Sequence, residues 1–222
     1  MSRPFQTAQQ YVLTTLRTEI LTGRYPENTH LRQEEVARRL NVSTTPVREA
    51  FRDLRAEGLV SIDPNKGVVT RSLTIDDVTE IYELRMTLEP MLAGRACLQM
   101  TDADLAAAQQ CHEAMSATAS PEQWSIVNET FHDHFVASQA HTRLFEIVAS
   151  LSRVARPYVA LSMHVDQEIM QSNNREHAAL LAAYRVRNAQ AVQTQTRVHL
   201  ENTRDALVAC VDHWMATHAV VR

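Results

Sequence analysis

The chain has 222 residues, of which 45% are hydrophobic and 22% are charged, and its formal net charge is −4. This composition is typical of a soluble globular protein with one large or two small domains. It excludes a membrane protein, because no apolar run approaches the roughly 18 to 20 residues of a membrane helix. The three cysteines lack the spacing of a disulfide framework or a zinc ribbon. The first residues also lack the profile of a secretion signal, so we expect a cytoplasmic protein.

The net charge changes sign along the chain near residue 73. The first 73 residues carry 11 Lys and Arg against 8 Asp and Glu, a net +3, whereas the remainder carries 11 against 18, a net −7. A basic front and an acidic back favour a nucleic-acid-binding module joined to a domain of another kind. We therefore expect two domains, residues 1–73 and residues 74–222.

The first predicted helix covers about residues 7–22. Apolar residues recur there at four-residue spacing, at Val12, Leu16 and Ile20, which is typical of an amphipathic helix. Gly23 marks its end. A loop, RYPENTHL, and a short helix in RQEEVARRL follow.

The stretch VSTTPVREAF starts the third predicted helix. Ser43 or Thr44 can cap this helix, and Pro46 fits its first turn, where a backbone N–H is not needed. Thr44, Thr45 and Arg48 share the outward side of that turn. The second helix of a helix-turn-helix motif places such residues against base edges and phosphates, and the alternative is an ordinary capped surface helix.

Two β-branched segments come next, at about residues 59–62 and 67–71, and a Pro-Asn-Lys-Gly turn joins them. The pattern predicts a β-hairpin with the basic residue Lys66 at its tip. Three helices followed by a hairpin predict a winged helix-turn-helix, whose wing faces the DNA backbone or the minor groove.

The segment TGRYPENTHLRQEEVARRLNVSTTPVREAFRDLRAEGLVSIDPNKGVVT resembles the DNA-binding domain of GntR-type bacterial transcription regulators. The shared pattern includes Leu-x-Val-Ser, Pro-Val-Arg-Glu-Ala, Glu-Gly-Leu-Val and a Gly in the wing. Many members have Arg where this chain has Thr44, so the base preferred there stays open. The resemblance implies double-stranded operator DNA as a partner, contacted by Arg32, Ser43, Thr44, Thr45, Arg48, Arg52, Lys66 and Gly67.

The second domain is predicted to be wholly helical. The helical patterns cover about residues 75–100, 102–117, 121–138, 142–166, 172–187 and 189–216. Thr101 with Asp104 has the spacing of a capping box at the start of the second pattern. The bundle resembles the FCD ligand-sensing domain of the same superfamily in its six-helix form. The predicted fold class is therefore mainly α, a winged helix-turn-helix followed by an all-α six-helix bundle.

Histidines concentrate in this second domain. The resemblance places Asn128, His132, His177 and His199 at the positions of the FCD metal site. Asn128 and His132 share one helix face at four-residue spacing, and the other two lie on two later helices. Such a set suits a divalent transition metal such as Zn²⁺ or Ni²⁺ with positions left open. Each histidine taken alone is better explained as a solvated or hydrogen-bonded core residue, and only the match of all three to family positions favours the metal site.

Asn128 departs from the family pattern, which usually has Asp at that position. An amide oxygen can bind a metal, but the lost negative charge weakens binding. Glu129 and Asp133 lie about 100° away around the helix and are poor substitutes. Three arrangements stay open: Asn128 as a weak fourth ligand, water in its place, or a metal-free site that binds the effector directly.

The resemblance also implies a small organic acid as effector. Arg85 occupies the position of an arginine that recurs on the first FCD helix, where a guanidinium can hold a carboxylate with two hydrogen bonds. A salt bridge from Arg85 to Glu89, four residues on, is the alternative. Arg156 and Tyr158, on a later helix, are further candidates for the effector site.

The predicted function is a transcriptional regulator, foremost a repressor, that binds a palindromic operator as a homodimer and responds to the acid. One alternative is a metal sensor, in which the ion itself is the signal, although Asn128 argues against a tight dedicated site. The other is a metal-dependent enzyme. The sequence contains no HExxH, phosphate loop or nucleophile motif that would support an enzyme.

Overall fold

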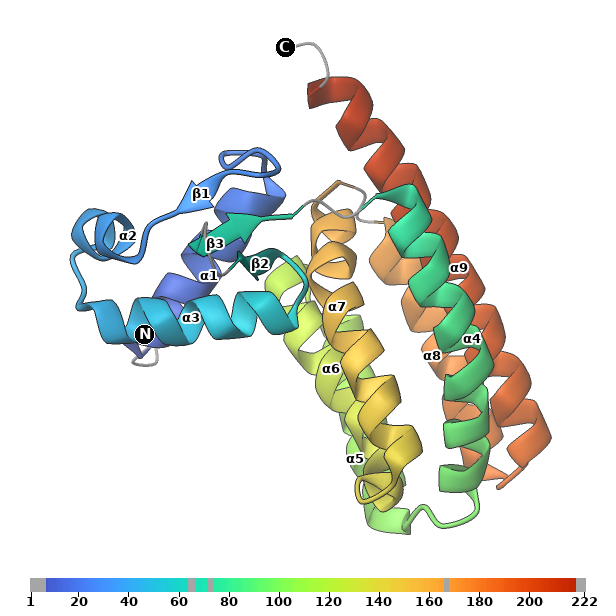
Figure 1. Ribbon diagram of the computed structural model, residues 1–222. Helices are drawn as coiled ribbons and strands as arrows, with labels where there is room; N and C mark the ends of the chain where they lie inside the picture. The colour runs from blue at the N-terminus through green and yellow to red at the C-terminus, as the bar shows by residue number, and fades with distance from the viewer. Residues whose placement is uncertain (1–6, 64–66, 72–73, 166–167, 219–222) are drawn as a thin grey trace. The chain divides into compact units, whose positions relative to one another are not determined.

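The computed structural model describes residues 7–63, 67–71, 74–165 and 168–218 (Figure 1). The chain forms two compact units, one up to Thr74 and one from Ile75 onward. Within the described residues, no helix is both long and apolar enough to span a membrane.

The first unit contains three helices and a small sheet. The helices are α1 (Ala8–Leu21), α2 (Gln33–Leu40) and α3 (Thr44–Ala56), and the strands are β1 (His30–Leu31), β2 (Val60–Asp63) and β3 (Gly67–Thr70). The strand order is β1-β3-β2, and both pairings are antiparallel. This is the predicted winged helix-turn-helix, with the β2–β3 hairpin as its wing.

Strand β1 is absent from the sequence prediction, which treated RYPENTHL as a loop. It has only two residues, too few to show the alternation that reveals a strand. Its place depends on distant partners, since His30 pairs with Val69 and Thr70 Oγ1 accepts a hydrogen bond from Thr29 N at 2.9 Å. Such contacts between residues about 40 positions apart leave no local pattern.

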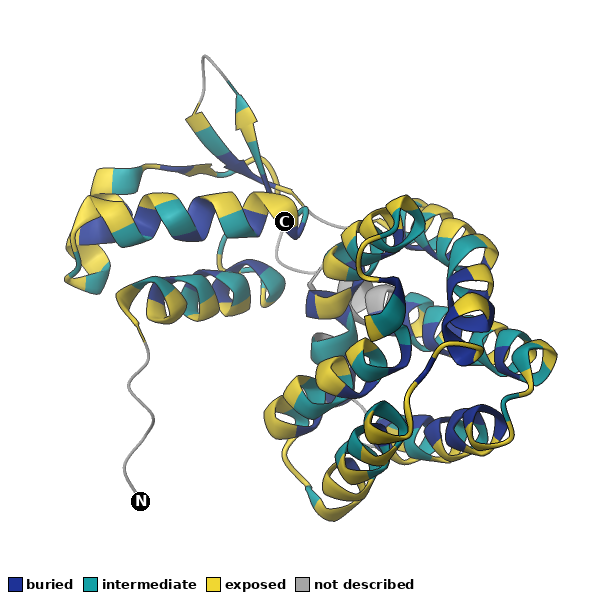
Figure 2. Cartoon of the chain, turned by 90° about the horizontal axis from the view of Figure 1, so that it is seen from below, coloured by how far each residue is buried: buried dark blue, intermediate teal, exposed yellow. Residues whose placement is uncertain are grey.

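Helix α3 is amphipathic and packs against α1. Its buried side consists of Val47, Ala50, Phe51 and Leu54, as the spacing predicted. Ser43 occupies the N-cap position, and its side chain makes no capping hydrogen bond. Figure 2 shows the resulting division of helix surfaces into buried and exposed stripes.

Ion pairs inside the first unit hold its helices together. Arg17 binds Glu57 through two hydrogen bonds, of 2.8 and 2.5 Å. Glu19, which is buried, accepts hydrogen bonds from both Arg24 and Arg39. These pairs neutralise several basic groups and leave other arginines of the unit facing solvent.

The second unit is the predicted six-helix bundle. Its helices are α4 (Ile75–Cys97), α5 (Asp102–Ala117), α6 (Pro121–Val136), α7 (Arg143–Val165), α8 (Glu168–Arg185) and α9 (Ala189–His218), with a 3₁₀ turn at Ala137–Gln139. Helix α8 begins four residues before the predicted start. The Thr101–Asp104 capping box is confirmed.

The bundle core lies among α5, α6, α8 and the adjoining ends of α4 and α9. Trp124, Phe131 and Tyr184 are among its largest fully buried side chains, and the Phe135 and Tyr184 rings stack 4.1 Å apart. Helix α4 packs mainly against α9. A β-carbon at Gly94 would collide with the side chain of Gln193, so glycine permits this close approach.

Candidate DNA-binding surface and candidate metal centre

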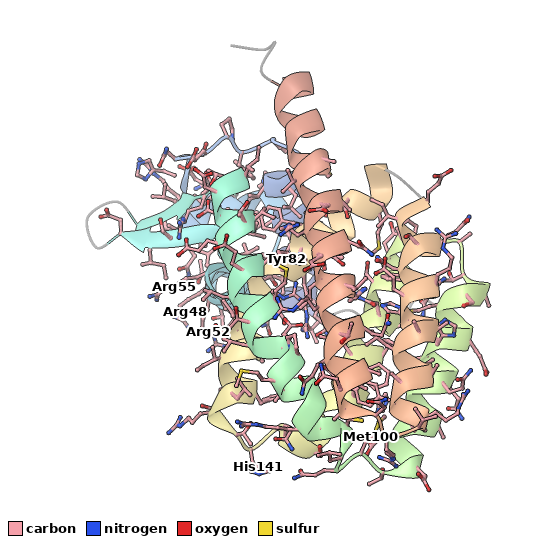
Figure 3. The ribbon with its side chains drawn as sticks, turned by 90° about the vertical axis from the view of Figure 1, so that its right-hand side faces the viewer. Arg48, Arg52, Arg55, Tyr82, Met100 and His141 are labelled. Atoms are coloured by element: carbon pink, nitrogen blue, oxygen red, sulfur yellow. The ribbon has the colours of Figure 1, made fainter. Side chains whose placement is uncertain are left out.

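Three arginines form an exposed stripe along α3. Arg48, Arg52 and Arg55 are spaced by four and three residues, which places them on one side of the helix (Figure 3). No ion pair joins any of them to another residue in the part of the chain that the structure describes. A helix side with three unpaired guanidinium groups suits a polyanion such as DNA. The sequence prediction missed Arg55, although its spacing from Arg48 places it on the same stripe.

The other predicted DNA contacts flank this stripe. Ser43, Thr44 and Thr45 are exposed where α3 begins. Arg32, the N-cap residue of α2, is exposed and lies 3.4 Å from Glu35. Gly67 opens β3 with φ of +76°, a backbone conformation that L side chains rarely adopt. Lys66 lies outside the described residues.

Three imidazoles from three helices meet inside the bundle. His132 lies on α6, His177 on α8 and His199 on α9. A ligating nitrogen from each lies within 4.8 Å of those of the other two, and the ring centroids are 5.0 to 5.3 Å apart. We call these three residues the histidine triad.

The environment of His132 and His177 favours neutral imidazoles. Burial, followed by the charge of His199, lowers the pKa of both His132 and His177 well below its usual value. Arg85 and Arg156 lower the pKa of His132 further. Neutral imidazole is the form that binds a metal, so His132 and His177 are in the metal-binding form at physiological pH.

His177 has no other polar role among the described residues. It is fully buried, and neither of its ring nitrogens has a hydrogen-bond partner there. A buried polar group without a partner costs about 1–3 kcal/mol. A metal ion bound to one nitrogen would remove part of this cost.

A carboxylate orients His199. Glu176 Oε2 lies 2.7 Å from His199 Nδ1, and Glu176 Oε1 accepts a hydrogen bond from Asn202 Nδ2 at 2.7 Å. A neutral His199 therefore carries its proton on Nδ1 and presents the lone pair of Nε2, an orientation that a carboxylate hydrogen-bonded to the other ring nitrogen commonly gives a metal-binding histidine. Glu176 precedes His177 in the chain, but only the packing of α8 on α9 brings it to His199.

Asn128 lies one helical turn before His132 on α6. Its Oδ1 atom is buried and lacks a hydrogen-bond partner among the described residues. Glu129 and Asp133 instead face Arg156, which pairs with both of them. The site therefore fits a divalent metal. His177 and Asn128 offer buried donor atoms without a hydrogen-bond partner among the described residues, and Glu176 orients His199.

Trp124 packs against the ring of His177, and polar contacts hold Trp124 in place. Trp124 stacks on it with centroids 5.7 Å apart. The indole Nε1 of Trp124 donates a hydrogen bond to Asn174 Oδ1 at 3.0 Å, and His112 Nε2 lies 3.0 Å from the backbone oxygen of Asn174. The sequence prediction did not include His112 or Trp124, because neither has a spacing that links it to the triad.

The three predicted effector residues have different environments. Arg85 pairs with Glu89, with Nε 2.5 Å from Oε1, so the salt bridge expected as the alternative is present. Arg156 has a side chain that is 42% exposed. Tyr158 is buried.

Two protein-family models match the chain. Residues 8–69 match the model of the bacterial regulatory proteins of the gntR family, and residues 80–202 match the model of the FCD domain. The chain belongs to the GntR family of regulators that carry an FCD domain. The predicted membership is confirmed, and this GntR/FCD protein is a transcriptional regulator, not an enzyme.

Several curated regulators are similar to this GntR/FCD chain. An uncharacterized HTH-type transcriptional regulator in the TAR-I ttuE-ttuC′ intergenic region of Agrobacterium vitis is 36% identical over 56% of this chain and 77% of its own length. The HTH-type transcriptional repressor GlaR of Escherichia coli K12 is 26% identical over 83% of this chain and 89% of its own.

Solved structures share the fold. A GntR-family regulator from Pseudomonas syringae pv. tomato is 26% identical, with a TM-score of 0.56 over 97% of this chain and 91% of its own. The E. coli McbR/YncC structure has a TM-score of 0.69 over 91% of this chain and 98% of its own, at 21% identity.

Proposed function

We propose that this GntR/FCD regulator is a repressor that binds a palindromic operator as a homodimer and releases it when a small carboxylic acid binds in the FCD domain. Residues 1–73 then serve DNA binding, and residues 74–222 serve effector binding and dimerisation. Relatives named as repressors, such as GlaR of E. coli and the gluconate operon transcriptional repressor of Bacillus licheniformis, support this direction of control.

The DNA-binding part of the proposal rests on the first turn of α3. Thr44, Thr45 and Arg48 would meet base edges in the major groove, with Arg52 and Arg55 along the phosphates. Ser43, Arg32 and the wing tip at Lys66 and Gly67 would contact the backbone. The exposed arginine stripe supports this assignment, because guanidinium groups without a described ion pair are free to contact the phosphates.

The histidine triad is the observation that carries the effector part of the proposal. His132, His177 and His199 would hold a divalent ion, Zn²⁺ or Ni²⁺, and the orphaned Oδ1 of Asn128 favours that residue as a fourth, weak ligand. The bound ion would supply a Lewis acid with positions open to an oxygen of the acid. Arg85, with Arg156 and Tyr158 as further candidates, would face the acid's carboxylate.

Elemental analysis of the purified protein tests the metal site. Wild type should hold about one equivalent of a transition metal per chain, and His177→Ala should hold almost none. His134→Ala is the matched control, since His134 is two residues from His132 and points to another side of α6. A metal-free wild type, even after reloading with Zn²⁺ or Ni²⁺, would contradict the metal centre.

Operator binding then tests the signal. Fluorescence anisotropy with the DNA upstream of the regulator's own gene would be measured with metal alone and with metal plus individual organic acids. We expect release only when an acid is present. Release by the ion alone would identify a metal sensor instead.

A further inference from the structure

The turn between α2 and α3 is held differently at its two ends. At the end of α2, Asn41 has a left-handed backbone with φ of +54°, and Val42 N donates a hydrogen bond to Ala37 O at 3.0 Å. At the start of α3, the N-cap residue Ser43 makes no side-chain capping hydrogen bond. The first turn of α3 therefore lacks the local side-chain bond that usually fixes the start of a helix.

Gln33 supplies a bond to the start of α3 from the other helix. It is the first residue of α2, and its Nε2 atom donates a hydrogen bond to the backbone oxygen of Thr44 at 3.0 Å. Thr44 is the first residue of α3. In the part of the chain that the structure describes, no other hydrogen bond joins α2 to α3. The amide of Gln33 thus connects the start of one helix to the start of the next.

The oxygen that Gln33 binds belongs to the turn that carries the proposed base contacts. In an α-helix, a backbone oxygen accepts the N–H group four residues further on, which for Thr44 is that of Arg48. A carbonyl oxygen has two lone pairs, so it can accept both hydrogen bonds. Thr44, Thr45 and Arg48 are all exposed, and Gln33 restrains the backbone from which they project.

The polar contacts between α3 and α1 lie further along α3. Gln9 Nε2 donates a hydrogen bond to Asp53 Oδ2 at 2.7 Å, and Arg17 binds Glu57, the C-cap residue of α3. Asp53 follows Thr44 by nine residues, and Glu57 follows it by thirteen. These two contacts hold the middle and the end of α3, whereas the contact from Gln33 holds its start.

We propose that Gln33 is a positioning residue for operator recognition, which fixes the first turn of α3 through the Thr44 carbonyl and so places Arg48 against its base. This inference rests on the proposed function for the contact between Arg48 and a base. Base contacts depend on distance and angle, because hydrogen bonds weaken steeply away from their preferred geometry. Attraction to phosphates decreases more slowly with distance. Loss of the Gln33 bond therefore reduces sequence discrimination more than general attraction to DNA.

Gln33→Met tests this role in the full-length protein. Methionine keeps the length and the net charge but has no donor. Fluorescence anisotropy would compare a duplex selected from random DNA by binding to wild type with a shuffled duplex of the same composition. We expect affinity for the selected duplex to fall by about 3- to 10-fold per half-site, the usual effect of one hydrogen bond between neutral groups, and affinity for the shuffled duplex to stay unchanged. No change on either duplex, or an equal fall on both, would overturn the proposal.

A double-mutant cycle with Arg48→Ala gives a readout that a merely structural role would not change. If Gln33 acts by placing Arg48, Gln33→Met should have little further effect on the selected duplex once the Arg48 side chain is removed. A general loss of stability would instead weaken binding equally in both backgrounds. Equal effects of Gln33→Met in wild type and in Arg48→Ala would therefore overturn the positioning role.

Gln9→Met is the matched control, because it removes the same amide from another hydrogen bond to α3. Its partner, Asp53, lies in the middle of the helix, between the buried residues Phe51 and Leu54. We expect a lower Tm and an unchanged ratio of the affinities for the two duplexes. If this ratio falls as far as in Gln33→Met, any weakening of the contacts of α3 has the same effect, and the proposal is wrong.

The positioning role and the proposed base contact can be tested apart. If Arg48→Ala leaves binding of the selected duplex unchanged, Arg48 makes no base contact and the proposed DNA contacts fail. If Arg48→Ala weakens binding and Gln33→Met does not, the base contact stands and the positioning role of Gln33 is overturned.

Discussion

The two units of this regulator build their candidate sites in opposite ways. The α3 stripe is exposed, charged and formed by residues within one short helix. The histidine triad lies inside the bundle, and its members come from three helices, α6, α8 and α9. Burial there lowers the pKa of His132 and His177. A polyanion is attracted by positive charge at a solvated surface, whereas a metal ion requires deprotonated donor atoms at fixed positions.

This difference implies that the two sites respond to different perturbations. Loss of charge on α3 should weaken DNA binding without affecting the bundle. Loss of a ligand in the bundle should affect metal binding and thermal stability without changing the arginine stripe. The following measurements, in order of expected effect, test that separation.

Metal removal should have the largest effect. Chelation should lower the Tm of wild type by about 5–10 °C, because a ligand at 100 times its Kd stabilises the folded state by about 2.7 kcal/mol. His177→Ala should show almost no further fall on chelation. Differential scanning calorimetry with and without EDTA measures both. An equal decrease in Tm in the two proteins would mean that the metal does not bind at the histidine triad.

Arg48→Ala should weaken operator binding by about 10- to 100-fold, the discrimination expected of one bidentate arginine–base contact. Its metal content and Tm should match those of wild type, since Arg48 is exposed and makes no described ion pair. Fluorescence anisotropy at several salt concentrations measures the affinity. Arg143→Ala, an exposed arginine of α7, should leave it unchanged.

Glu176→Gln should weaken metal binding by about 10- to 100-fold, the usual cost of losing the carboxylate that orients a metal-binding histidine. The amide oxygen of Gln can still accept a hydrogen bond from His199 Nδ1, but without the negative charge of Glu176 that bond is weaker. Competition with a chromophoric chelator measures the metal Kd. Asn202→Ala, which removes only the second hydrogen bond to Glu176, should have a smaller effect.

Asn128→Asp should strengthen metal binding by about 10-fold, because one negative charge returns beside the dication. The same chelator competition measures the change. The metal-free variant should be less stable than wild type, since the new charge would be buried next to neutral histidines. An unchanged metal Kd would mean that residue 128 does not reach the ion.

Acid should destabilise the metal-free protein modestly. The pKa of His132 and of His177 is lowered in the folded state, so between about pH 6.5 and the folded pKa the unfolded chain binds more protons. The contribution of these two histidines to stability is therefore constant above about pH 6.5 and decreases as the pH falls below it. Tm measured from pH 8 to pH 5 should show this fall, and His132→Asn should reduce it.

Much of the fold could be predicted because its signals are local. The spacing of Val12, Leu16 and Ile20 and the capping pair Thr101–Asp104 each act within a few residues. Strand β1 escaped prediction because it exists only through pairing with β3. The four metal candidates came from family resemblance, and the structure brings the three histidines together.

The sequence by itself determined the helices, the wing, the family and the histidines that could act together. Periodicity, capping and turn residues act over a few positions and are therefore readable along the chain. Only the tertiary structure decided that Glu176 orients His199, that Arg156 faces Glu129 and Asp133, and that Ser152 joins Arg85 in binding Glu89. Hydrogen bonds and burial depend on which helix faces pack together, and that packing brings together residues that are far apart in the sequence.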